Sequence, residues 1–433
     1  MPQPPSSGPF RVGLVYLYTG LTELLPLHAV YALLMTSHGV STGELSVLFA
    51  VWTVTTFVCE VPSGALADRF PRHRVLAAAA LAQCTGFALW TALPSLGSFA
   101  AGFVLWGAGT ALTSGTLQSL LYDGLAAEGR AGQYARVSSR VAAVQACSVA
   151  ASSLAATPLV LLGGYPATGW VSVLLTLLAV PTALGLGRRA PGPEPAAVPK
   201  PAHVPIPAPV PEPEPEPQGY LAVLRAGLAE AGGTPRVRSA VLLAAALTGL
   251  GVVDEYLPVL AREAGTPAAA VPLLLLLPWA AMAAGGFAGG RLAGAGDRLL
   301  AVLLGAGGAA LAAGALTGRP AGFLGIAAFY WVLRLAQIVA DTRLQHAISG
   351  PARATVTSVA GLGAQAVALA VFLTLGLAAR WASAAVLVAL TAVPVLLLAV
   401  RLALRPDPAH HVPPPQPDEP PPSARTGAVE RHP

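Results

Sequence analysis

Long apolar runs recur along the whole chain, and they constrain its fold more than any other feature. Of the 433 residues, 55% are hydrophobic and 10% are charged, whereas a typical soluble protein has about 25% charged residues. We count twelve runs of 18 or more residues, each long enough for an α-helix to cross a hydrocarbon core of about 30 Å. The composition therefore predicts an all-α membrane protein with twelve transmembrane helices. The predicted spans are 12–36, 45–66, 75–94, 98–121, 138–162, 167–187, 239–261, 269–292, 298–317, 321–342, 355–379 and 381–402.

The distribution of basic residues predicts the orientation. If the N-terminus is inside, the outer loops hold only Arg262, Arg319 and Arg380 of the 25 basic residues, and Arg334 lies within a span, which leaves 21 on the inner side. Cytoplasmic loops are enriched in Lys and Arg, so both termini are expected to be cytoplasmic. The first run lacks a clear cleavage site, so we interpret it as a retained helix. One lysine and no asparagine in the chain suggest a GC-rich bacterium, and hence a bacterial plasma membrane.

Proline-rich segments divide the chain. The tract at 190–217 separates six predicted helices from six and is expected to be extended polyproline II. Leucines at helical intervals predict a short interfacial helix at 220–231. The predicted organisation is a cytoplasmic N-terminus at 1–11, a six-helix bundle at 12–187, a cytoplasmic linker with the interfacial helix at 188–238, a second six-helix bundle at 239–402 and a disordered cytoplasmic tail at 403–433.

The predicted turn between spans two and three carries an unusual cluster of charges, in the sequence SGALADRFPRHRV. Basic residues there fit the topology rule, but an aspartate does not follow from it. Gly64, Asp68, Arg69, Arg72 and Arg74 resemble the signature of this loop in the major facilitator superfamily. Its members are solute transporters that alternate between outward-open and inward-open states. The resemblance implies the major facilitator fold, with two six-helix bundles, over roughly residues 10–405.

The chain departs from that signature at Pro71, where a glycine is usual, and at His73, where a base is common. A carboxylate at Asp68 near the start of span eleven would meet a helix N-terminus, a contact that stabilises by about 0.3–1 kcal/mol. With an arginine as an added partner it would form a cytoplasmic clasp between the halves. Such a clasp favours the outward-facing state and must break for the inward-facing one.

A faint internal repeat extends the predicted gate. After span four the chain runs from Asp123 to Arg136, and after span ten it runs from Asp341 to Arg353. In both loops the arginine opens the next helix. Because many transporters are built from duplicated bundles, we assign these four residues to the cytoplasmic gate as well.

Ionisable residues inside the spans are functional candidates, because each costs about 2.5–3.5 kcal/mol on insertion. Glu23 lies in the middle of span one on a face with Tyr16, Thr19 and Pro26. We interpret it as a proton carrier or as a recognition site for a cationic solute. The alternative is a buried structural hydrogen bond.

Three further acidic residues have two interpretations each. Glu60 shares a helical stripe with Trp52, so it either lines the cavity or anchors the clasp. Asp254 and Glu255 precede Pro258; they either line the outer vestibule, where mutual repulsion would suit one to proton exchange, or lie in solvent beyond an earlier helix end.

In span ten, Arg334 has Gln337 and Asp341 on its face. We expect a buried ion network that is either a structural salt bridge or part of substrate binding or coupling. His28 and His346 have no ligand spacing nearby, so we expect packing or interfacial positions.

Mild polar residues predict the wall of a solute path. With the aromatics Tyr16, Trp52 and Trp106, such a wall suits a hydrophobic or amphipathic organic molecule. Two patterns typical of proton antiporters in the superfamily are absent, an arginine early in span four and a glycine-proline pattern in span five. Proton coupling is therefore inferred from the carboxylates alone. The predicted wall comprises Thr110, Thr113, Gln145, Ser148, Ser152, Ser358 and Gln365.

These features predict a drug-efflux-like secondary transporter, monomeric, coupled to protons, with a small-molecule substrate and no cofactor or metal. No basic patch with interleaved aromatics indicates nucleic-acid binding. Uptake or facilitated transport of a small nutrient by the same fold stays an alternative, as does a relative that has lost transport. A polytopic membrane enzyme is a further alternative, but the sequence has no zinc-helix, phosphate-loop or nucleophile-elbow motif.

Overall fold

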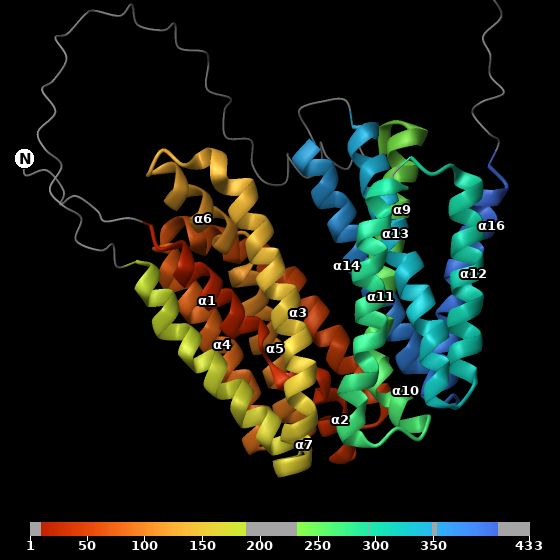
Figure 1. Ribbon diagram of the computed structural model, residues 1–433, viewed down its shortest axis with the longest axis horizontal. Helices are drawn as coiled ribbons and strands as arrows, with labels where there is room; N and C mark the ends of the chain where they lie inside the picture. The colour runs from red at the N-terminus through yellow and green to blue at the C-terminus, as the bar shows by residue number, and fades with distance from the viewer. Residues whose placement is uncertain (1–9, 188–231, 293, 349–352, 406–433) are drawn as a thin grey trace, which may run out of the picture.

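The computed structural model describes residues 10–187, 232–292, 294–348 and 353–405, and this part of the chain contains helices and no strand. The proline-rich tract, the interfacial helix expected at 220–231 and the tail beyond 405 lie outside the described residues. Two helical bundles stand side by side (Figure 1), one on each side of the linker. The prediction of an all-α membrane protein is confirmed.

The N-terminal bundle is built from five long apolar segments, the last of which is long enough to cross a membrane twice. Its elements are α1 (Val12–Glu23), η1 (Pro26–Ala29), α2 (Tyr31–Ser37), α3 (Thr42–Arg69), α4 (Arg72–Ala92), α5 (Leu96–Thr113), α6 (Thr116–Ala126), η2 (Ala131–Gln133) and α7 (Tyr134–Leu186).

Helix α7 supplies two membrane crossings. Its 53 residues would span about 80 Å as one straight helix, more than twice a hydrocarbon core. The backbone leaves the helical conformation at Gly163 and at Gly164, where φ is 64°, a value that favours glycine. The two arms fold back on each other at this bend (Figure 1). The 11 apolar segments long enough to span a membrane therefore give twelve crossings, as predicted.

The C-terminal bundle repeats the plan of the first. Its elements are α9 (Pro235–Gly249), η3 (Leu250–Tyr256), α10 (Leu257–Glu263), η4 (Ala268–Ala270), α11 (Val271–Arg291), α12 (Asp297–Leu316), η5 (Pro320–Gly322), α13 (Phe323–Ala347), α14 (Arg353–Ala378), α15 (Ala384–Leu390) and α16 (Ala392–Ala403).

Spans one, four and seven, each predicted as a continuous helix, are broken. Span one breaks around Pro26, which cannot continue the hydrogen-bond ladder. Span four breaks at Gly115, where φ is 64°. Span seven passes through the 3-10 segment η3 before Pro258 opens α10. Breaks at this depth are tolerated where the backbone is buried in protein or lines a cavity.

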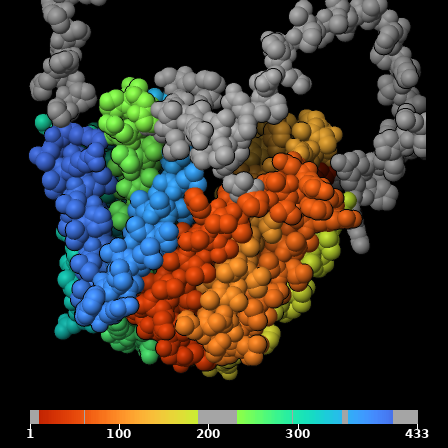
Figure 2. Space-filling view, turned by 180° about the vertical axis from the view of Figure 1, so that it is seen from behind, coloured from red at the N-terminus to blue at the C-terminus, as the bar shows by residue number. Residues whose placement is uncertain are grey.

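The bundles contact each other at one end, which we name the closed end; it carries residues 37–42. There Ser46 Oγ and Tyr256 OH share a hydrogen bond of 2.7 Å. The rings of Phe49 and Phe372 are 5.4 Å apart. A Cβ on Gly43 would lie 3.3 Å from the carbonyl oxygen of Gly376, so the backbones of α3 and α14 come close. The view from behind shows these two helices side by side (Figure 2).

The other end, which carries the α3–α4 turn at 69–72, is the open end. Burial along α3 falls toward it: Leu45, Leu48 and Phe49 are buried, whereas Val58 and Leu66 are exposed. The ribbons of the two bundles converge at the closed end and diverge toward the open end (Figure 1). The arrangement is that of a two-bundle protein open on one side.

Candidate functional site

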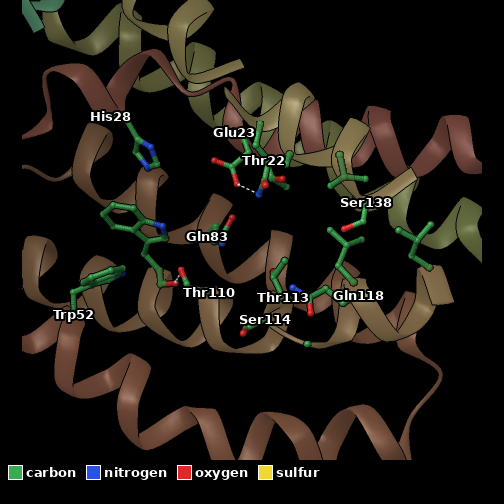
Figure 3. Close-up of a pocket in the computed structure, with 17 residues that line it drawn as sticks. Thr22, Glu23, His28, Trp52, Gln83, Thr110, Thr113, Ser114, Gln118 and Ser138 are labelled. Carbon is green, nitrogen blue, oxygen red and sulfur yellow. Dashed lines mark hydrogen bonds between the residues drawn. The ribbon is translucent and has the colours of Figure 1, made fainter. Parts of the chain in front are cut away.

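Two adjoining cavities lie beside the bundle interface, with volumes of about 500 and 280 Å³. The larger is lined by the N-terminal bundle (Figure 3), and the smaller by both bundles. They share Glu23, His28, Trp52 and Trp106, so they form one continuous site. The other polar residues around the larger cavity are Thr22, Gln83, Thr110, Thr113, Ser114, Gln118, Ser138 and Gln145.

Glu23 owes its position to the break in the first span. It is the last residue of α1, so its side chain extends where the helix gives way to η1. Gln145 Nε2 donates a hydrogen bond of 3.2 Å to Glu23 Oε1 (Figure 3). Ser152 Oγ donates one of 3.1 Å to the backbone oxygen of Glu23. The structure thus brings together three polar residues that the sequence assigned to one path.

Aromatic rings form one wall of the site. The His28 and Trp52 rings lie 4.7 and 5.5 Å from the ring of Trp106, and Phe87 packs behind them at 5.9 Å from Trp106. His28 Nε2 and Trp52 Nε1 are buried and have no hydrogen-bond partner among the described residues. An unpaired buried polar group is unfavourable, so these two atoms are available to a bound molecule.

Two acidic residues form the opposite wall of the smaller cavity. Asp254 and Glu255 lie in η3, beyond the end of α9 at Gly249, and are half-buried. Tyr31 OH donates a hydrogen bond to Glu255 and so links the two bundles. The Tyr31 ring in turn stacks on Trp90 at 5.8 Å. Within the described residues, neither of these acids nor Glu23 forms an ion pair.

The comparison with protein families decides the identity of this architecture. A sequence model of the Major Facilitator Superfamily matches residues 12–371. The chain belongs to this superfamily. It is therefore a membrane transporter rather than an enzyme, and the alternative of a polytopic enzyme is wrong. A search of curated protein sequences finds no match.

Solved structures with the same fold agree with this assignment. A mutant of the nucleoside transporter NupG has a TM-score of 0.70 at 9% identity, over 90% of this chain and 98% of that chain. A bacterial homologue of the human lysosomal transporter Spinster, inward-facing and occupied, has a TM-score of 0.68 at 16% identity, over 92% of this chain and 96% of that chain. A bacterial homologue of the iron transporter ferroportin, inward-facing, has a TM-score of 0.63 at 13% identity, over 90% of this chain and 97% of that chain. Such identities show the major facilitator fold alone.

The other predicted pathway residues of this superfamily member are placed differently. Glu60 is exposed, and its Oε1 accepts a hydrogen bond of 3.4 Å from Ser114, which lines the larger cavity. Tyr16 instead packs against the cluster that contains Leu121, and it lines neither cavity. Gln365 also lines neither. Helical periodicity placed Tyr16 on the face of Glu23, but two turns away along the axis, where that face packs against neighbouring helices.

The buried ion network expected around Arg334 is wrong. Arg334 is exposed and donates a hydrogen bond of 3.4 Å to Gln337. Gln337 Nε2 in turn donates to the backbone oxygen of Leu247 at 3.2 Å. Asp341 is exposed and forms no ion pair with Arg334, because seven residues on a helix separate side chains by about 10 Å along the axis.

The predicted gate residues divide between the bundles. Arg72 forms an ion pair with Asp123, so these two residues lie together within the N-terminal bundle. Asp68 is exposed and has no ion pair with a described side chain. Arg353 begins α14, but its side chain lies outside the described part. A Cβ on Gly64 would meet nothing within 4 Å. Also exposed are the gate arginines Arg69, Arg74 and Arg136.

Sequence reasoning missed part of the wall. His28 was assigned to packing; its ring does pack on Trp106, but it also lines both cavities. Gln83 and Gln118 received no assignment, although both line the larger cavity. A lone glutamine within an apolar span, as at Gln83, is the signal that could have identified it.

Proposed function

We propose that this transporter exports a small amphipathic organic solute that carries a positive charge, in exchange for protons. The observation that carries this proposal is the shared cavity wall, in which Glu23 lies beside the rings of Trp52 and Trp106. Alternating access takes place between bundles at 12–187 and 239–402, joined by the linker at 188–238. The protein works as a monomer in a bacterial plasma membrane, with both termini and the open end at the cytoplasm.

The chemistry of the wall supports this class of solute. Aromatic rings and aliphatic side chains favour an apolar body. The faces of tryptophan rings also attract a cation, with a gain of about 0.5–2 kcal/mol. Three carboxyl groups, from Glu23, Asp254 and Glu255, line the smaller cavity, and none of them has an ion-pair partner in the described part of the chain. A phosphate ester would meet these carboxyl groups, and neither arginine nor lysine is among the described residues that line the two cavities. An organic cation would find both carboxylates and aromatic rings.

The same carboxyl groups support exchange with protons. Glu60 accepts a hydrogen bond from Ser114 in the wall of the larger cavity. Glu23 lies where the two cavities join. Glu255 accepts a hydrogen bond from Tyr31 at the contact between the bundles. A carboxylate binds either a proton or a solute cation well, but not both together. Competition at Glu23 would therefore couple the two fluxes.

The test uses proteoliposomes with an acidic interior and the lipophilic cation tetraphenylphosphonium as the probe. We expect the pH gradient to drive accumulation of the probe, and Glu23→Gln to reduce this by at least tenfold, because glutamine keeps the contact with Gln145 but cannot release a proton. The matched control is Glu44→Gln, since Glu44 is an exposed residue that caps α3. Wild-type flux in Glu23→Gln would refute the proposal. The membrane potential by itself draws this cation into cells, so greater accumulation of the probe in cells that contain the protein than in cells without it would favour the uptake alternative.

A further inference from the structure

A separate cleft of about 880 Å³ lies at the open end of the C-terminal bundle. It is formed by α9, α12, α13 and α16 and shares no residue with the two central cavities. Among the residues that the structure describes, five arginines line it together with a single acidic residue, Asp297. Its charge is thus opposite in sign to that of the solute site. The arginines are Arg236, Arg238, Arg343, Arg401 and Arg405.

Two of these arginines are fixed by the one carboxylate. Arg343 Nη1 lies 2.6 Å from Asp297 Oδ1, and its Nη2 donates a hydrogen bond of 2.8 Å to the backbone oxygen of Ala295. Arg405 Nη1 lies 3.6 Å from Asp297 Oδ2, and Arg405 Nη2 donates a hydrogen bond to Ser239 Oγ. Asp297 is therefore shared between two guanidinium groups, and among the described lining residues there is no second carboxylate.

Arg238 and Arg401 are exposed and form no ion pair within the described residues. Arg238 lies in the first turn of α9, and Leu242, one turn further, lines the same cleft and is 51% exposed. Arg401 lies in the last turn of α16 between Leu397 and Leu404, which are 65% and 78% exposed. Arginine beside exposed leucine at the end of a transmembrane helix marks the depth of lipid headgroups.

The topology rule explains arginines at this end of the protein, but it does not require them to converge on one cleft with an apolar edge. Guanidinium groups bind phosphate through paired hydrogen bonds. Basic pockets between transmembrane helices are a known form of lipid headgroup site. We propose that this cleft binds a phosphate group, supplied by an anionic membrane lipid, with Arg238 and Arg401 on the phosphate oxygens and Leu242 against an acyl chain. Free phosphate shares the headgroup chemistry but not the acyl chain.

The test uses the full-length protein, purified in a nonionic detergent and titrated with phosphatidylglycerol, phosphatidylcholine or inorganic phosphate. The readouts are the melting temperature and lipid binding in native mass spectrometry. We expect phosphatidylglycerol to bind and stabilise more strongly than the other two. The double variant Arg238→Gln/Arg401→Gln is expected to weaken its apparent affinity by about 30-fold, since each basic residue near the surface strengthens binding to anionic lipid by roughly fivefold.

The matched control is Arg11→Gln/Arg140→Gln, which removes two exposed arginines near the starts of α1 and α7. It should bind phosphatidylglycerol like the wild type. Unchanged affinity in Arg238→Gln/Arg401→Gln would overturn the proposal, as would equal binding of phosphatidylcholine. An effect of inorganic phosphate equal to that of phosphatidylglycerol would overturn the assignment to a lipid. Because mass spectrometry counts bound lipid directly, the comparison holds even if a variant melts at a lower temperature.

Discussion

The substitution Tyr31→Phe should shift this transporter away from the state seen here. Tyr31 belongs to α2 in the N-terminal bundle, and its hydroxyl group donates to Glu255 of the C-terminal bundle. Phenylalanine removes that hydroxyl group but keeps the ring, which stacks on Trp90 at 5.8 Å and meets Phe49 edge-on at 6.1 Å. The change therefore tests the hydrogen bond and leaves the aromatic packing in place.

The size of the shift follows from the bond that is lost. A hydrogen bond to a carboxyl group contributes about 1–3 kcal/mol, from the neutral to the ionised form. If the closed end separates when the transporter turns to its other state, only the state seen here loses this energy. The ratio of the two states should then change by about 5- to 150-fold toward opening at the closed end. The second link, between Ser46 and Tyr256, is unaffected and limits the change.

Pulsed electron-spin distance measurements can follow this equilibrium. Spin labels at Ser37→Cys and Arg319→Cys would report the separation of the bundles at the closed end, since both residues are exposed near it. The labels require a background in which Cys59, Cys84 and Cys147 are replaced. We expect the long-distance population to grow in Tyr31→Phe.

The control is Tyr122→Phe, because Tyr122 is 50% exposed on α6 and lines neither central cavity. Its distance distribution should equal that of the parent. A Tyr31→Phe distribution that also equals the parent would refute the reasoning, since the hydrogen bond between the bundles would then contribute nothing to the choice of state.

Two further predictions concern the gate and the helix packing. Asp68→Asn should lower solute flux in proteoliposomes by about fivefold while the protein still inserts. The reason is that the proposed clasp would lose a charged contact with a helix N-terminus, which contributes about 1 kcal/mol. Full flux in this variant would contradict the clasp. Gly86→Ala should lower the melting temperature by several degrees, because the added Cβ would lie 2.9 Å from the backbone oxygen of Gly102. Such overpacking costs about 1–3 kcal/mol, and each kcal/mol lowers the melting temperature by about 2–4 °C. Gly97→Ala is its control, since a Cβ there meets nothing within 4 Å, and an equal loss in both variants would show that the close approach of α4 and α5 is not the cause.

The sequence by itself determined the number and length of the membrane crossings. A helix must satisfy its own backbone hydrogen bonds in lipid, so an apolar run of sufficient length predicts a span without knowledge of its neighbours. The same local logic identified Glu23 and Gln145 as polar groups that need a partner, and the structure joins them at 3.2 Å. Even the break at Gly164 left a local signal, a glycine pair followed by Pro166.

Only the tertiary structure decided which polar residues meet. Tyr31 and Glu255 are 224 positions apart in the chain, and no periodicity within one helix predicts a contact across two bundles. The depth at which a helix face meets a cavity or a neighbouring helix is set by packing between helices, which is why Glu23 lines the cavity and Tyr16, on the same face, packs in a cluster. For the same reason, arginines that the topology rule counts one by one converge on a single cleft at the end of the C-terminal bundle.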